Sequence, residues 1–304
     1  MSASLPPGLQ VIERGWLSAN LVIAHGKHPA LVDSGYASHA PQTLLLVQAA
    51  LPSQMPTLLV NTHLHSDHCG GNAVLQAAFP AMRTLIPPGQ AQVLTDWDED
   101  ALSFRATGQH CPRFGFDGLL SPGHTITMGE LTWQVHAAPG HDPHSVVLFE
   151  AQSRTLISAD ALWENGFGVV FPELEGEHAF DEVSATLDMI DALAPLTVVP
   201  GHGPVFSHSG KVMARARQRL ASFVNDPVRH AQHAGKVLLK FKLLEVQQQS
   251  RPDFMAWALT VPYMARVHQR FFADSDLESW LTRLLADLVK AGAAETCHDW
   301  VRNR

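Results

Sequence analysis

The segment Thr62–His68 constrains this chain more than any other part of its sequence. It reads THLHSDH, so three histidines and one aspartate lie within six residues, directly after the apolar run Thr57–Val60. A short apolar run bounded by polar residues predicts a buried strand. If the backbone continues in an extended form, alternate residues point to the same side, so His63 and His65 are predicted to face one way.

Imidazole and carboxylate groups this close together pack poorly, because they are costly to bury without partners. Neutral imidazole and ionised carboxylate are instead natural ligands of divalent metal ions. Asp67 and His68 are predicted to join the cluster from a turn, and Gly70-Gly71 to let the backbone enter a helix from about Asn72. The cluster therefore predicts a metal site.

Three further metal-capable side chains each follow a predicted strand at a turn. They are His141 after the strand 131–135, Asp160 after the apolar run 155–157, and His202 after the strand 196–199. Each is weak evidence alone, because a single histidine or aspartate in such a turn is commonly structural. Together with the first cluster, and in this order, they strengthen the prediction of a metal site.

Short apolar runs alternate with amphipathic stretches over the first two thirds of the chain, which is typical of a mixed α/β fold with antiparallel hairpins. Hairpins are expected where residues 21–23 pair with 31–32, and where residues 145–149 pair with 155–157. A helix is expected over residues 180–193, because its apolar positions fall on one face. Residues 93–125 are expected to form an irregular excursion of a length that often covers a binding site.

The pattern becomes mostly helical from about residue 211, and the charge changes sign at the same place. Residues 1–210 contain 6 Lys and Arg against 20 Asp and Glu, a formal charge of −14. Residues 211–304 contain 15 Lys and Arg against 9 Asp and Glu, a charge of +6. We therefore predict a domain of residues 1–210 and a second, helical domain of residues 211–304.

The basic residues of the second domain leave two interpretations open: a solvated helix face, or a surface that draws in an anionic substrate. On the second interpretation, residues 211–304 form a helical lid that lines the substrate entrance. Near its end, Ser275 and Glu278 have the spacing of a capping box, and Gly292 is predicted to end the last helix. The basic residues are Lys211, Arg215, Arg217, Arg219, Lys236, Lys240 and Lys242.

Several features predict a cytoplasmic protein with no membrane partner. No apolar run approaches the roughly 18 to 20 residues that span a bilayer. The first ten residues, MSASLPPGLQ, lack the basic segment and apolar run of a signal peptide. Three cysteines do not indicate a disulfide framework, which fits a reducing compartment. The oligomeric state is left open.

The order of these motifs resembles the metallo-β-lactamase superfamily over about residues 10–210. The similarity runs from LVDSG at residues 31–35 through HLHSDH, PGH and SAD to GHGP. It implies an α+β fold, a four-layer αββα sandwich with metals at one edge of its two sheets, followed by a mostly helical C-terminal extension. Within that extension, residues 288–293 are similar to the last helix and turn of a winged-helix-like module.

The resemblance also implies seven ligands for two divalent metal ions. The first ion would be held by His63, His65 and His141. The second would be held by Asp67, His68 and His202, and Asp160 would bridge both. Asp33 would support the ligands from behind, and Asp67 would also act catalytically by orienting the attacking hydroxide. Zinc is favoured by the histidine-rich set, with iron and manganese as alternatives.

The sequence THLHSDHCGGN is most similar to glyoxalase II-like, lactonase-like and LACTB2-like hydrolases. Two metal ions lower the pKa of a shared water, and the metal-bridged hydroxide attacks a carbonyl or phosphoryl centre. Hydrolysis of a small thioester or related ester is therefore predicted. The alternatives are phosphodiester hydrolysis, as in LACTB2-like ribonucleases, a lactonase, and a non-catalytic metal-binding regulatory protein.

A small-molecule substrate is the expected partner, and an anionic one if the basic domain attracts it. The overall acidity argues against a nucleic-acid partner without excluding one, because proteins that bind nucleic acid usually carry a strong basic footprint.

Overall fold

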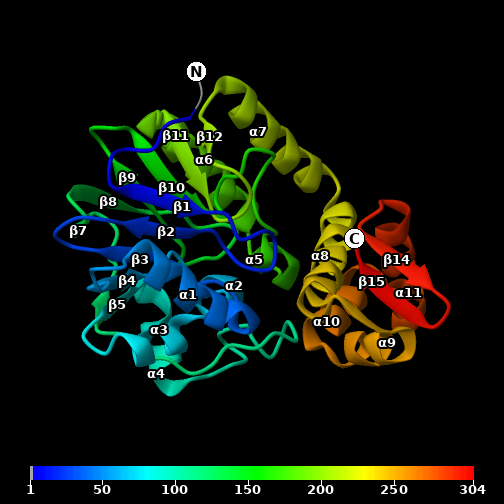
Figure 1. Ribbon diagram of the computed structural model, residues 1–304. Coiled ribbons are helices and arrows are strands. Elements are labelled where there is room, and N and C mark those ends of the chain that lie inside the picture. Colours follow the sequence, from blue (N-terminus) through cyan, green and yellow to red (C-terminus); the bar gives the residue numbers. More distant parts are fainter. Residues whose placement is uncertain (1–2) are drawn as a thin grey trace.

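Two six-stranded sheets, packed face to face, form the centre of the larger part of the molecule (Figure 1). The computed structural model describes residues 3–304. The first sheet has the order β1-β2-β3-β4-β5-β6, and the second has the order β12-β11-β10-β9-β8-β7. Helices cover the outer face of each sheet. The predicted four-layer αββα sandwich is confirmed.

The strands of the first sheet are β1 (Leu9–Ile12), β2 (Leu21–Ala24), β3 (Ala30–Val32), β4 (Leu58–Val60), β5 (Arg83–Ile86) and β6 (Gly118–Leu119). Its outer face and edge carry the helices α1 (Ala40–Ala50), α2 (Ser66–Cys69), α3 (Asn72–Ala78) and α4 (Ala91–Asp96). The strands of the second sheet are β7 (Thr125–Met128), β8 (Leu131–Ala137), β9 (Val146–Glu150), β10 (Thr155–Ala159), β11 (Thr197–Pro200) and β12 (Phe206–Ser207). The helices α5 (Phe171–Glu175) and α6 (Ala179–Leu193) follow β10, and α7 (Gly210–Asn225) follows β12.

Alternation along the strands builds three apolar layers. Leu21 and Ile23 of β2 pack outward against α1 and α3, whereas Val22 packs inward between the sheets. In the second sheet, Val147 of β9 packs outward against α6 and α7, and Leu148 packs inward. Because both faces of each sheet are buried, these strands are apolar at nearly every position.

The hairpins expected from the sequence are present. β2 pairs antiparallel with β3, and β9 pairs antiparallel with β10. The predicted helix at 180–193 is α6, with Val183, Leu187 and Ile190 buried against the sheet. The irregular excursion is shorter than expected, because its first residues belong to α4, which ends where Trp97 takes a left-handed conformation.

The C-terminal region, defined here as residues 210–304, is mostly helical, as predicted (Figure 1). It also contains a small antiparallel sheet of order β13-β15-β14, which the sequence analysis did not anticipate. The winged-helix-like resemblance stays a prediction. Its elements after α7 are α8 (Pro227–Val246), β13 (Gln248–Ser250), α9 (Arg251–Thr260), α10 (Pro262–Phe271), α11 (Leu277–Lys290), β14 (Ala294–Cys297) and β15 (Trp300–Asn303).

The predicted capping box at Ser275 is wrong. Asp276 is the N-cap of α11, and its side chain accepts a hydrogen bond from the Ser279 amide at 2.8 Å. An aspartate carboxylate is at least as good a cap as a serine hydroxyl, and its charge complements the helix dipole. At the other end of α11, Gly292 adopts φ 71°, as expected of a residue that ends a helix.

The C-terminal region packs against the larger part through two shared apolar clusters, one at α7 and one at α8 to α11, and through polar contacts. Val169 and Leu174, near α5, belong to the same buried cluster as the cores of α8 to α11. The Tyr263 amide donates to the carbonyl of Ala106 at 2.9 Å, which ties α10 to the irregular excursion. Within residues 3–304, none of the helices has the length and apolarity required to cross a bilayer.

Candidate metal centre

The predicted site residues follow strands that end at one edge of the sandwich. β3 and β4 are parallel, so Asp33, directly after β3, lies beside the segment that follows β4 and carries His63. β10 and β11 are also parallel, so Asp160 and His202 emerge together from the second sheet. The short helix α2 then brings Asp67 and His68 back toward the same edge.

Glycine backbone makes room for two of these side chains. A Cβ atom at Gly201 would collide with Oδ1 of Asp160, and one at Gly168 would collide with Nδ1 of His141. Larger residues at either position would push the aspartate or the imidazole out of place.

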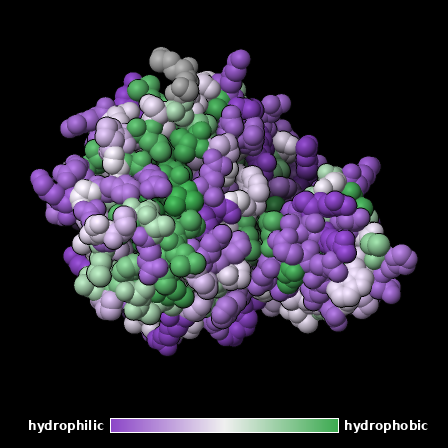
Figure 2. All heavy atoms as spheres, viewed as in Figure 1, coloured by the Kyte–Doolittle hydropathy of each residue, from purple (hydrophilic) through white to green (hydrophobic). Residues whose placement is uncertain are grey.

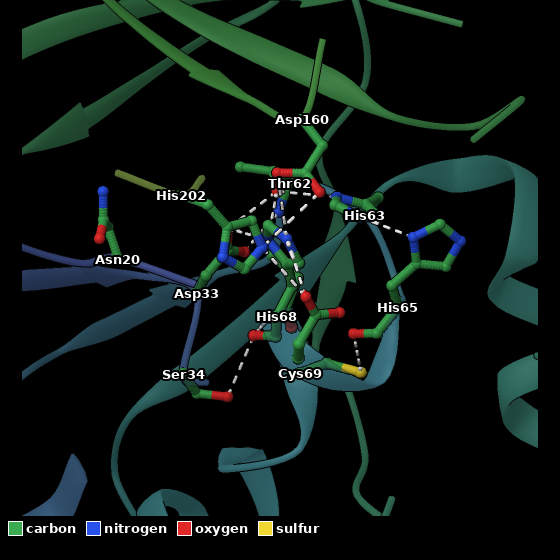
Figure 3. Close-up of polar contacts among 12 residues, drawn as sticks. Asn20, Asp33, Ser34, Thr62, His63, His65, His68, Cys69, Asp160 and His202 are labelled. Atoms are coloured by element: carbon green, nitrogen blue, oxygen red, sulfur yellow. Dashed lines mark hydrogen bonds and ion pairs between the residues drawn. The ribbon is translucent and has the colours of Figure 1, made fainter. Parts of the chain in front are cut away.

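Three imidazoles form a first ligand group: His63, His65 and His141. The Nδ1 atom of His65 lies 3.0 Å from Nε2 of His63 and 2.9 Å from Nε2 of His141. One nitrogen of each ring therefore points to a common centre, and Figure 3 shows His63 and His65 converging. Three ring nitrogens facing one another are an arrangement that a divalent cation stabilises.

Two carboxylates and two imidazoles form a second ligand group: Asp67, His68, Asp160 and His202. Nε2 of His202 lies 3.0 Å from Oδ2 of Asp67, and Nε2 of His68 lies 3.5 Å from Oδ1 of Asp160. Within this group one candidate ligand atom per residue lies within 4.8 Å of all the others.

Asp160 lies between the two groups. Its Oδ2 atom is 3.5 Å from Nε2 of His141, in the first group, and 3.8 Å from Nε2 of His202, in the second. Its Oδ1 atom faces His68 (Figure 3). A carboxylate so placed can reach a cation in either group, which is the position expected of a bridging ligand.

A second contact orients several of the imidazoles. Nδ1 of His141 faces the carbonyl oxygen of Val169, and Nδ1 of His202 donates to the carbonyl of Gly15 at 3.2 Å. Each contact leaves Nε2 free to face the cluster. Such outer hydrogen bonds fix the tautomer and the orientation of a ligating histidine.

The His68 ring is held by Asp33, as the sequence resemblance implied. Nδ1 of His68 donates to Oδ2 of Asp33 at 2.7 Å. The same carboxylate accepts from the amide and the hydroxyl of Thr62, at 2.9 and 2.8 Å. Asp33 itself has φ 57°, a left-handed conformation that aspartate tolerates better than most residues. The buried carboxylate is thus fully committed to positioning His68 and the start of the THLHSDH segment.

Burial sets the protonation of the first ligand group. Burial, together with the neighbouring His68 and His65, lowers the pKa of His63 well below its ordinary value. Burial and His65 likewise lower the pKa of His141 to about 4. Both rings are therefore neutral near pH 7, which is the form that binds a metal ion.

Carboxylates reverse that effect in the second group. Burial disfavours the charged form of His68, but Asp160 and Asp33 outweigh it and raise the pKa of His68 well above its ordinary value. Burial is likewise outweighed at His202, where Asp160 and Asp67 raise the pKa of the ring. Burial also opposes ionisation of Asp160, yet His202 and His68 hold the pKa of this carboxyl well below its usual range. The second group thus keeps its carboxylates ionised.

The residues present fit a pair of divalent cations. The Nε2 atom of His68 is buried without a hydrogen-bond partner within residues 3–304, although its ring is locked toward the cluster. A buried polar atom without a partner is costly, and a metal ion removes the cost. Five imidazoles and two carboxylates are a donor set typical of zinc and of first-row transition metals.

A cavity of about 790 Å³ opens onto the two ligand groups. One wall comes from the larger part and includes His65, Asp67 and Asp160; the opposite wall comes from α7, α8, α10 and α11 of the C-terminal region. The irregular excursion contributes Ser103 and Gln109, so it does border the site, as its length indicated. Figure 2 shows hydrophobic surface at the junction between the larger part and the C-terminal region.

Two tryptophans at the cavity escaped the sequence analysis. Trp16 stacks on the ring of His202, with centroids 5.5 Å apart and planes 8° from parallel. Trp163 packs edge-on against Trp16, and its Nε1 donates to Oδ1 of Asp160 at 3.2 Å. The position of Trp163, three residues after Asp160, was the one available signal.

Cys69 follows His68 directly but is unsuited to act as a nucleophile. Its thiol is buried, and burial together with Cys111 raises its pKa well above the ordinary value. Its Sγ lies 3.8 Å from Sγ of Cys111, within an apolar cluster under the excursion. Nucleophilic cysteines need the opposite, a lowered pKa and access.

Residues 14–202 match the family model of the metallo-beta-lactamase superfamily. The chain belongs to this superfamily, whose members are generally hydrolases that use divalent metal ions. The match includes all seven residues of the two ligand groups.

Among similar proteins is a hydroxyacylglutathione hydrolase of Anaeromyxobacter dehalogenans (strain 2CP-C), 32% identical over 147 residues, which cover 48% of this chain and 47% of the relative. A second, from Dechloromonas aromatica (strain RCB), is 27% identical over 272 residues, covering 90% of this chain and 86% of the relative. An acyl-coenzyme A thioesterase MBLAC2 of Gallus gallus is 24% identical and covers 50% of this chain and 58% of its own length. Except for the second, the chain spans about half the length of these relatives.

Solved structures extend the similarity of fold to the whole chain. The metallo-beta-lactamase family protein TTHA1429 of Thermus thermophilus superposes with a TM-score of 0.58 at 18% identity, covering 99% of this chain and 100% of that one. TTHA1623, solved in a di-iron-bound form, has a TM-score of 0.54 at 25% identity and covers 68% of this chain and 96% of that one.

Proposed function

We propose that the protein hydrolyses a small thioester or a related ester with the help of two divalent metal ions. The observation that carries the proposal is the convergence of seven ligand side chains into two groups with Asp160 between them. The names of the relatives support the substrate class, because hydroxyacylglutathione and acyl-coenzyme A are both thioesters.

His63, His65 and His141 would hold one ion, Asp67, His68 and His202 the other, and Asp160 both. Zinc is the preferred ion, with iron and manganese as alternatives. When bound, such a pair supplies activation of water near neutral pH and polarisation of the substrate carbonyl oxygen.

The protein's own side chains would orient the attacking water. Asp67 has one carboxylate oxygen 3.0 Å from His202, and it is partly accessible to the cavity, unlike the fully buried His68. We assign it the role of accepting a hydrogen bond from the attacking water at Oδ1 or Oδ2. The tryptophan pair and the C-terminal wall line the cavity beside this carboxylate.

A metal-verified activity screen tests the proposal. Elemental analysis of protein purified without chelator should give close to two equivalents of metal per chain, and a ratio near one after supplementation would contradict the dinuclear site. The same preparation is assayed on thioesters, lactones, β-lactams and phosphodiesters. Thioester turnover well above the others supports the proposal; preferential cleavage of a phosphodiester or a lactone overturns the substrate class. No turnover of any ester would favour a non-catalytic metal-binding protein.

A further inference from the structure

The cavity wall opposite the ligand groups contains four cationic side chains, and they differ in how far their charge is neutralised. Arg266 forms an ion pair with Glu175 at 3.0 Å. Lys236 lies 3.8 Å from Asp287. Lys240 uses its three donors on oxygen atoms of the last strand and turn, at 2.5 to 2.7 Å. Arg219, in α7, has among residues 3–304 neither a carboxylate within ion-pair distance nor, unlike Lys240, an acceptor for each of its buried donors.

The Arg219 guanidinium is fixed in place despite this missing anion. It lies over the rings of Phe167 and Phe223, with its Cζ atom 5.7 and 5.1 Å from the ring centroids. Nη2 donates to Nε2 of His233 at 2.9 Å. A Cβ atom at Gly166 would lie 2.5 Å from Cδ of Arg219, so glycine at that position lets the side chain pass toward the cavity.

One buried donor of this guanidinium lacks a hydrogen-bond partner among residues 3–304. Nε is the buried atom that has no hydrogen-bond partner in the part of the chain that the structure describes, and burial lowers the pKa of the group. His233 does not compensate the charge, because burial and Arg219 hold its pKa at about 3, so it is neutral. A partly desolvated cation without an anion is costly to maintain, and a rigid planar fork is well suited to a carboxylate or phosphate.

Apart from Arg219, the protein offers an anion in this cavity little unpaired positive charge. Residues 1–210 carry a formal charge of −14, and two divalent ions leave that part acidic. An anionic substrate is repelled by such a field unless local positive charge offsets it. Arg217, on the same helix, cannot do this, because it is paired with Asp188 and Asp191 at 2.9 and 3.0 Å.

We propose that Arg219 is the specificity-determining residue that binds an anionic group, a carboxylate or a phosphate, of the substrate at a distance from the bond that is cleaved. The hydrolysis of this substrate rests on the proposed function, whereas the binding of its anionic group to Arg219 does not. The anion can belong to the thiol half of the substrate or to the acyl half.

Three thioesters separate these sources: acetyl-glutathione, with anions on the thiol half; succinyl-N-acetylcysteamine, with an anion on the acyl half; and acetyl-N-acetylcysteamine, with none. In Arg219→Gln, we expect KM to rise about tenfold for an anionic substrate, while kcat and the KM of the neutral substrate stay unchanged. The substrate that responds identifies the half that carries the anion. Arg219→Lys, which keeps the charge, should recover part of the loss, and Arg217→Gln should behave as wild type.

Equal effects on the neutral and the anionic thioesters would show that Arg219 acts only through structure and would overturn the inference. So would an unchanged KM for both anionic substrates. Calorimetric binding of thioether analogues, in which a methylene separates carbonyl and sulfur, gives a readout without turnover. If the wild type hydrolyses none of the thioesters, the proposed function fails. Even then, tenfold weaker binding of an anionic analogue to Arg219→Gln than to the wild type supports the inference about Arg219. Unchanged binding of the analogue overturns that inference.

Discussion

Two buried clusters of histidines lie on either side of the cavity, and their neighbours give them opposite properties. At the strand ends, His68 and His202 face aspartates, which raise the pKa of both rings. On α8, His230 and His233 face Arg219 and phenylalanine rings, and burial lowers the pKa of these two histidines to about 4 and about 3. The same residue type is thus a ligand candidate in one cluster and a neutral packing group in the other.

Carboxylates distinguish the two clusters, so removing the central one should have the largest effect. In Asp160→Ala, hydrolysis should fall on the order of a thousandfold and bound metal should drop, because the carboxylate that we propose as the bridge between the ions is lost. Thermal unfolding should remain cooperative, since the side chain is not part of the apolar core. Asp188→Ala, an exposed change on α6, serves as the control. Full turnover with both metals retained would mean that the ligand assignment is wrong.

A change at Asp33, which holds the predicted ligand His68 in place, should reduce metal binding less than a change at a ligand itself. Asp33→Asn keeps the side-chain shape and tolerates φ 57°, but it removes one carboxylate oxygen and the charge that holds His68. Metal affinity, measured by competition with a chromophoric chelator, should fall roughly 10- to 100-fold. Asp117→Asn is the control. The Asp117 carboxylate also accepts a hydrogen bond from a backbone amide, that of Thr84, but it belongs to neither ligand group. Equal affinity in both variants would show that Asp33 has no positioning role.

The second cluster should appear in the pH dependence of stability. His230 is fully buried and keeps a pKa of about 4, so the unfolded chain takes up the proton first as the pH falls below about 6.5. The stability tied to this neutral ring is present above that pH and is lost as the pH falls toward 4. Between pH 7 and pH 5 the wild type should therefore lose about 2 kcal/mol more than His230→Gln in urea unfolding. Loss of metal affects both proteins alike, and His28→Gln is the exposed control. Parallel curves for wild type and His230→Gln would contradict the assignment.

The two clusters also differ in how visible they are in the sequence. Four of the seven predicted ligands lie together in THLHSDH, and the other three each follow a strand, so periodicity and turns located them. Trp16 and Arg219 could not be found in this way, because they approach the site from a loop and a helix far away in the sequence. Arg215 and Arg217 were grouped with Arg219 as one basic run, yet of these three only Arg219 lines the cavity, whereas Arg215 bonds to Asn165 and Arg217 to Asp188 of α6.

The small C-terminal sheet was missed for a different reason. Its strands are only three or four residues long, and their pattern of burial does not alternate enough to predict strands. The N-cap of α11 was placed one residue early, because Ser275 and Asp276 are both good caps and only the backbone conformation decides between them. The main sandwich was predictable because its strands are buried on both faces and separated by clear turns.

The order of assembly follows from where the ligands lie along the chain. Asp160 and His202 are brought together when β11 joins β10, through the parallel register that also links the Gly201 amide to the Ala159 carbonyl. Closing such long loops costs chain entropy, which is recovered late in folding. Neither ligand group is complete in a chain that has formed the first sheet alone. For the proposed ligand set we therefore expect uptake of metal to be coupled to a late step of folding, so that the ions stabilise the finished sandwich rather than its nucleus.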